Sequence, residues 1–232
     1  MKLTETQIAE LYKFTRKHYV EHYDVQTELV DHLANDIEQN LEENLNLSFE
    51  QARDTSFKKF GVFGFMNVVE AKQKQLGKKY NKIIWNLMKE WFSIPKIIIT
   101  SAIFMIFYIL MSLNINHNYL SILMLILALV DVFLVSKLSK KSKQRFKEQS
   151  KKYLLEDMIF RMGAFSSILV FSNLLQLSTF LKSSPSVYFK FFVASLITLA
   201  ILYSYISLII IPQRAEELLE ETYPEYKRVN NL

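Results

Sequence analysis

Residues 28–36 carry four ionisable side chains whose spacing could support metal binding or acid–base chemistry. Glu28 and His32 are four residues apart, as are His32 and Asp36, so a helix places all three on one side with Asp31 beside them. The spacing is not the H-E-x-x-H pattern of zinc enzymes, and no second helix offers an evident completing set. We therefore interpret Glu28, Asp31, His32 and Asp36 as an exposed face that binds a partner, and expect no metal or other cofactor.

Nucleophilic catalysis has little support in this sequence. The chain has no cysteine, which excludes thiolate nucleophiles, thiolate metal ligands and disulfides. Its four glycines lack the spacing of a phosphate-binding loop, and the G-x-S-x-G pattern is absent. We expect that the protein is not an enzyme, and a membrane-embedded enzyme is the least favoured of the alternatives.

Long apolar runs dominate the second part of the chain. Across residues 97–136, Asp131 and His117 are the only acidic or basic side chains. At 1.5 Å per residue the shorter runs reach roughly 25 Å, and flanking interfacial residues can complete a hydrocarbon layer of about 30 Å. A soluble core of buried helical hairpins is the alternative, but a chain this short could not bury four such segments. We predict a four-helix transmembrane bundle over residues 97–212, with helices at about 97–113, 119–136, 158–181 and 187–211.

The distribution of basic residues predicts how these helices are oriented. Segments 71–96 and 137–153 are rich in lysine and arginine, whereas the connections 114–118 and 182–186 contain Lys182 alone. Both termini are therefore expected in the cytoplasm, and we expect no signal peptide. Most of the net charge of +5 flanks the spans, so we expect contact with the anionic inner leaflet and none with nucleic acid directly. The membrane-surface basic residues of the cytoplasmic loop 137–153 are predicted to be Lys137, Lys140, Lys141, Lys143, Arg145, Lys147, Lys151 and Lys152.

Polar residues interrupt the second and third predicted spans. Asp131 and Arg161 each lie about one turn from the cytoplasmic end of their span, so adjacent antiparallel helices would bring them to similar depth. Because a charge inside a bilayer is costly, we predict an ion pair, although each side chain could instead reach the interface alone. Asn173 and Gln176 could line a cavity or hydrogen-bond a neighbouring span.

Cap residues divide the first part of the chain into helices. Thr4 with Gln7, and Ser48 with Gln51, have the spacing of capping boxes, and Asp24 could cap a helix between them. We predict helices from about 5 to 20, from 24 to 41 and from 48 to 61, followed by one long helix over 66–91. An all-α protein follows, with an acidic module (1–79), a basic juxtamembrane helix (80–96), the transmembrane bundle (97–212) and a cytoplasmic tail (213–232).

The stretch ELVDHLANDIE, followed by LSFEQARDTSFKKFG, resembles the HAAS-type helical domain of bacterial membrane proteins, which is related to permease-prefix domains. The likeness covers about residues 5–75, and the GVFGF turn lacks the proline common in that family. It implies a bacterial cytoplasmic-membrane protein with a protein-binding module, often associated with PadR-like transcriptional regulators, and carries over no catalytic residue. The matching residues are Leu29, His32, Leu33, Ile37, Ser48, Phe49, Glu50, Ala52, Phe60 and Gly61.

We therefore predict an integral membrane regulatory or signalling protein whose cytoplasmic module binds a protein partner, either a regulator or a permease component. The alternative is an accessory subunit of a transporter or exporter. The basic loop either holds anionic lipid or docks on the acidic face of residues 28–43.

Overall fold

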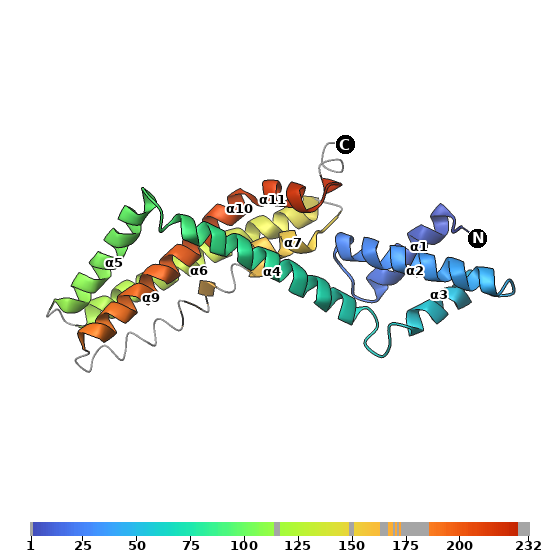
Figure 1. Cartoon of the computed structure of the whole chain (residues 1–232), viewed down its shortest axis with the longest axis horizontal. Helices are drawn as coiled ribbons and strands as arrows, with labels where there is room; N and C mark the ends of the chain where they lie inside the picture. The colour runs from blue at the N-terminus through green and yellow to red at the C-terminus, as the bar shows by residue number, and fades with distance from the viewer. Residues whose placement is uncertain are drawn as a thin grey trace. The chain divides into compact units, whose positions relative to one another are not determined.

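The computed structural model describes residues 2–113, 117–148, 151–162, 167–168, 170, 172 and 186–226. These residues form helices joined by short connections and contain no β-strand, which confirms the all-α prediction (Figure 1). The chain divides into two compact units. Unit 1 comprises Met1–Lys78 with Gln149–Leu154, and unit 2 comprises Lys79–Glu148 with Leu155–Leu232.

Unit 1 is built around α2 (Tyr23–Glu43), which packs against α1 (Glu5–Lys17) and α3 (Phe49–Lys58). Both predicted capping boxes are present, so backbone N–H groups that would otherwise lack a partner are satisfied at the start of α1 and of α3. The apolar stripe of α2 forms the centre of the unit, where Leu29, Leu33 and Ile37 are fully buried. Burying each of these side chains contributes about 1.5–3 kcal/mol.

The turn between α3 and α4 (Met66–Glu90) closes this core. Gly61 adopts a φ of +77° at the end of α3, and Gly64 adopts +52°. A side chain at Gly64 would also approach the Phe57 ring, since a Cβ atom there would lie 3.1 Å from Phe57 Cζ. The turn thereby inserts Phe65, which is 2% exposed, among the rings of Phe14, His18, Phe57 and Phe60.

A short strap, residues Lys151–Leu154, also belongs to unit 1. The backbone N–H of Tyr23 donates to the Lys152 carbonyl at 2.7 Å, and the backbone N–H of Leu154 donates to Asp24 Oδ1 at 3.0 Å. Asp24 is thus not the helix cap that the sequence suggests, because the N-cap of α2 is His22, two residues earlier. The strap contacts the first turn of α2.

Unit 2 contains the second half of α4 and the apolar helices. Two helical stretches, Tyr119–Lys147 and Val187–Gln213, are long and apolar enough to cross a membrane, whereas the apolar helix Lys96–Ser112 is shorter. Most of the predicted span at 158–181 lies outside the described residues. In chain order the remaining elements are α5 (Lys96–Ser112), α6 (His117–Glu148), α7 (Leu154–Asp157), the π-helical η1 (Met158–Met162), α9 (Val187–Tyr205), the π-helical η3 (Ile206–Ile210), α10 (Ile211–Gln213) and α11 (Ala215–Thr222).

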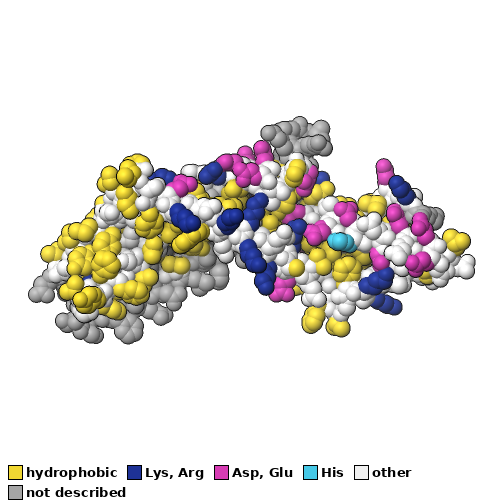
Figure 2. All heavy atoms as spheres, in the orientation of Figure 1, with side chains coloured by type: hydrophobic (Ala, Val, Ile, Leu, Met, Phe, Trp, Pro, Cys, Tyr) yellow, Lys and Arg dark blue, Asp and Glu magenta, His cyan; other side chains and the backbone are white. Residues whose placement is uncertain are grey.

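The apolar helices present hydrophobic side chains outward as well as inward. α5 and α9 pack through a core that includes Phe107 and Ile197. Figure 2 shows hydrophobic side chains gathered over α5 and α9 on the side drawn. Ile98 and Phe133, for example, are each 68% exposed. An apolar surface of this kind marks contact with lipid or with another protein.

Two segments of unit 2 are more ordered than the sequence predicted. The expected loop 137–153 is largely helical, because α6 continues to Glu148 through good helix formers without a glycine or proline. The expected tail begins with α11, whose Leu218 and Leu219 are buried. Their spacing from Ala215 is the helical i, i+3, i+4 pattern and was the available signal for this helix.

Candidate functional site

Two acids of the predicted partner-binding face are used inside unit 1. Glu28 Oε2 lies 2.6 Å from Lys72 Nζ of α4, and Asp36 Oδ1 lies 2.6 Å from Lys59 Nζ. Burial would raise the pKa of Asp36, but hydrogen bonds from Lys59, Ser56 and Asn40 together with the Lys59 charge outweigh it, and this pKa is lowered. Asp31 and His32 are exposed. The acidic face therefore also fastens α2 to its neighbours.

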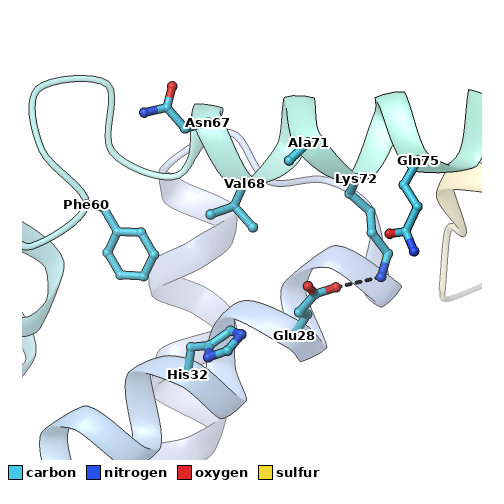
Figure 3. A pocket seen from close by; sticks show the side chains of 8 residues that line it. All are labelled: Glu28, His32, Phe60, Asn67, Val68, Ala71, Lys72 and Gln75. Carbon is cyan, nitrogen blue, oxygen red and sulfur yellow. Dashed lines mark hydrogen bonds and ion pairs between the residues drawn. The ribbon is translucent and has the colours of Figure 1, made fainter.

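A groove of about 540 Å³ lies between α2 and the first half of α4 (Figure 3). Phe60, Val68 and Ala71 supply apolar lining. Glu28 and His32 project from α2 toward α4, and the Glu28–Lys72 ion pair crosses between the two helices. The full set of lining residues is Glu28, His32, Phe60, Asn67, Val68, Ala71, Lys72 and Gln75.

The local sequence explains why the groove stays open. Val68, Ala71, Lys72 and Gln75 recur at three- and four-residue intervals, so they share one face of α4. Ala71 is the smallest of these side chains, which leaves space between the helices. The sequence prediction found Glu28 and His32 but missed the α4 side of the groove, because nothing local in the sequence shows which face of α4 turns toward α2.

Exposed apolar residues precede α4 in the turn that follows Phe60. Val62 is 99% exposed and Phe63 is 72% exposed. Neither side chain packs in the core of unit 1, whereas that of the neighbouring Phe65 does. In the sequence, the available signal for this surface was an apolar pair between two glycines, Gly61 and Gly64.

The chemistry of the groove suits binding. Apolar lining with a polar and charged rim is the usual composition of a protein-recognition surface. The lining residues include no hydroxyl or thiol nucleophile. Within the part of the chain that the structure describes, no group of three or more His, Asp or Glu side chains could hold a metal ion.

No protein-family model matches this chain, and no curated protein or solved structure matches it either.

The predicted ion pair between Asp131 and Arg161 is not formed. Arg161 Nη1 instead lies 3.2 Å from Asp157 Oδ1, one turn away on the same segment. Asp131 accepts hydrogen bonds from the hydroxyls of Ser167 and Ser204. The sequence prediction paired neither serine with Asp131, because they lie 36 and 73 residues from it in the chain. Asn173 and Gln176 lie outside the described residues.

The eight basic residues predicted at the membrane surface separate into three groups. Lys137, Lys140, Lys141, Lys143 and Lys147 are exposed along the end of α6. Lys151 and Lys152 belong to the strap, where Lys151 Nζ lies 4.0 Å from the centroid of the Tyr23 ring. Arg145 turns inward: its Nε donates to Glu156 Oε1 at 2.9 Å, so it is less exposed than the lysines of α6. The Glu156 side chain is fully buried, and burial raises the pKa of Glu156 more than the Arg145 charge and hydrogen bond lower it.

Proposed function

We propose that this chain is a regulatory or signalling protein of the bacterial cytoplasmic membrane whose cytoplasmic module, unit 1, binds a protein partner in the groove between α2 and α4. The groove is the observation that carries the proposal. It joins apolar lining to a charged rim on one face of a well-packed module. Such a surface binds a partner through its apolar centre and selects it through its charges.

The partner is proposed to be a transcriptional regulator or a permease component, as the resemblance to HAAS-type domains implies. An apolar side chain of the partner would enter between Phe60, Val68 and Ala71. Asp31 and His32 would set the charge preference at the edge, since Glu28 and Asp36 already have lysine partners. Charged rims mainly accelerate encounter and exclude wrong partners.

Membrane insertion with four spans is part of the same proposal. The apolar α5, α6 and α9 and their exposed hydrophobic side chains support it, as does the lysine-rich end of α6. The third span is proposed from the apolar sequence at 158–181. Both termini would then face the cytoplasm, with the anionic inner leaflet next to the basic segments.

Cysteine labelling tests this topology. The chain has no cysteine of its own, so the unsubstituted protein gives no labelling signal. In intact cells, a membrane-impermeant maleimide is expected to label Leu113→Cys and Ser186→Cys, which precede the second and fourth spans. Leu45→Cys in the module and Lys141→Cys on α6 are expected to react only after lysis. Labelling of Lys141→Cys and Ser186→Cys from the same side would contradict a third span between them.

Filling the groove is expected to displace the partner. With a photo-crosslinking amino acid at Asn67 on the rim, we expect a defined protein adduct in cells. Ala71→Trp should reduce this adduct at least about tenfold, which corresponds to roughly 1.4 kcal/mol of binding free energy. Mass spectrometry of the adduct then identifies a regulator or, for the accessory-subunit alternative, a transporter component.

Gln73→Trp is the matched control, since Gln73 is exposed on the same helix and does not line the groove. This variant should leave the adduct unchanged. Equal adduct yields from the Ala71→Trp and Gln73→Trp variants would remove the groove as the binding site, whatever the topology experiment shows.

A further inference from the structure

Asp131 lies where three segments of unit 2 meet. Its side chain projects from α6 and the residue is 3% exposed. Ser167 Oγ, from the segment after η1, donates to Asp131 Oδ2 at 2.9 Å. Ser204 Oγ, from the last turn of α9, donates to Asp131 Oδ1. Each carboxylate oxygen therefore accepts one hydroxyl hydrogen bond.

The polar cluster continues beyond Ser204 into the π-helical η3. Ser207 is fully buried, and its hydroxyl donates to the Ser204 carbonyl at 3.4 Å. The change from α-helix to π-helix occurs directly after Tyr205, between these two serines. A π-helical segment widens the helix and occurs frequently at functional sites. A buried carboxylate, the two hydroxyls that donate to it and a third buried hydroxyl thus lie in this part of unit 2.

Asp131 has only neutral hydrogen-bond partners among the described residues. Arg161, the nearest candidate from the sequence, is engaged by Asp157. Removing a carboxylate from water without a counter-charge is costly, both in a protein interior and in a bilayer. A bound cation would supply the missing charge.

We propose that Asp131, Ser167 and Ser204 form a binding site for a hard monovalent cation, for which Na⁺ is the probe. A serine hydroxyl that donates its hydrogen to the carboxylate keeps lone pairs for a cation, so the observed hydrogen bonds are compatible with ligation. One carboxylate neutralises one positive charge, whereas a divalent ion would leave an excess charge in an apolar surrounding. Oxygen-only ligands also disfavour transition metals, which select nitrogen and sulfur.

This site is independent of the groove on unit 1 and adds a second ligand class to the protein. The cation would join α6 to the end of α9 and to the segment that carries Ser167. Its binding would therefore stabilise the contact between these segments, because a ligand that binds only the folded state raises stability by mass action.

Equilibrium binding of radiolabelled ²²Na⁺ tests the proposal. The full-length protein is purified in detergent, with choline as the only other cation in the buffer. We expect saturable binding by the wild type and none by Asp131→Asn. Ser204→Ala should bind at least about tenfold more weakly, since it loses one oxygen near a charged group. Ser195→Ala removes a half-buried α9 hydroxyl that donates to the Phe191 carbonyl and not to Asp131, so this variant should bind like the wild type.

Thermal unfolding at constant ionic strength provides the second readout. The melting temperature should rise when Na⁺ replaces choline in the wild type and in Ser195→Ala, but not in Asp131→Asn. If Asp131→Asn is not monodisperse, Ser204→Ala carries the comparison. Equal Na⁺ binding by the wild type and the folded Asp131→Asn or Ser204→Ala variant would overturn the proposal. So would a wild type whose melting temperature is the same in Na⁺ and in choline.

Discussion

Replacing Arg145 with methionine is expected to lower the free energy of unfolding of unit 2 by about 3–5 kcal/mol, the usual cost of removing one partner of a buried ion pair. Arg145 Nε contacts the fully buried carboxylate of Glu156 at 2.9 Å, and its other guanidinium nitrogens reach Glu216 and Tyr226 at 3.3 Å. Without the guanidinium, the buried Glu156 carboxylate loses its ion-pair partner. Hydrogen exchange of the α6 amides in detergent measures the loss.

The effect should depend on pH through Glu156. Because burial raises the pKa of Glu156, its favourable contribution to wild-type stability is complete below the usual glutamate value of about 4.3. That contribution is lost as the pH rises through the raised value. Arg145→Met removes the compensating charge, so its destabilisation should be larger at neutral pH than in acid.

Two controls separate loss of the ion pair from loss of packing. Lys143→Met changes an exposed residue of the same helix and should alter stability by no more than about 0.5 kcal/mol. Arg145→Met combined with Glu156→Leu should recover most of the loss, since an apolar pair can replace a buried ion pair. A double variant as unstable as Arg145→Met alone would contradict this account.

Phe65→Ala is expected to destabilise unit 1 by about 3–5 kcal/mol, the range for removing a buried phenylalanine. Phe65 is 2% exposed and meets the Phe57 ring at a centroid distance of 4.8 Å and the Phe60 ring at 4.9 Å. The surrounding rings belong to three different parts of the unit, so they cannot all close over the space. Native-state hydrogen exchange of the α2 amides in the full-length protein measures this change.

Phe63→Ala is the matched control for this experiment. Phe63 lies two residues away in the same turn but is 72% exposed, so its loss should cost no more than about 0.5 kcal/mol. Similar protection factors in the two variants would show that the aromatic cluster does not hold the module together.

Features fixed by neighbours in the sequence were predictable. Thr4 with Gln7, and Ser48 with Gln51, form the capping boxes that their spacing indicates, and Gly61 takes the left-handed conformation at the end of α3. In each case the interacting groups lie within four residues, so local geometry decides the outcome. The apolar stripe of α2 is predictable in the same way, since a helical period of 3.6 residues places Leu29, Leu33 and Ile37 on one side of the helix, where all three are buried.

Features that depend on how helices turn toward one another were not predictable. Arg145 resembles its lysine neighbours in the sequence, yet it turns inward because the buried Glu156 carboxylate and Glu216 meet it there. The hydroxyl partners of Asp131 come from two other segments, and serine is too common in apolar helices to reveal such pairings. The groove likewise required knowing which face of α4 turns toward α2.

The strap has a consequence for how this architecture can be cut and recombined. Since the strap, Lys151–Leu154, completes unit 1, the folded module is not one continuous segment that ends at Lys78. A fragment severed there would leave the Asp24 carboxylate without the Leu154 amide and the first turn of α2 without its cover. A gene fragment that encodes the complete module must therefore extend past α6, the second apolar helix.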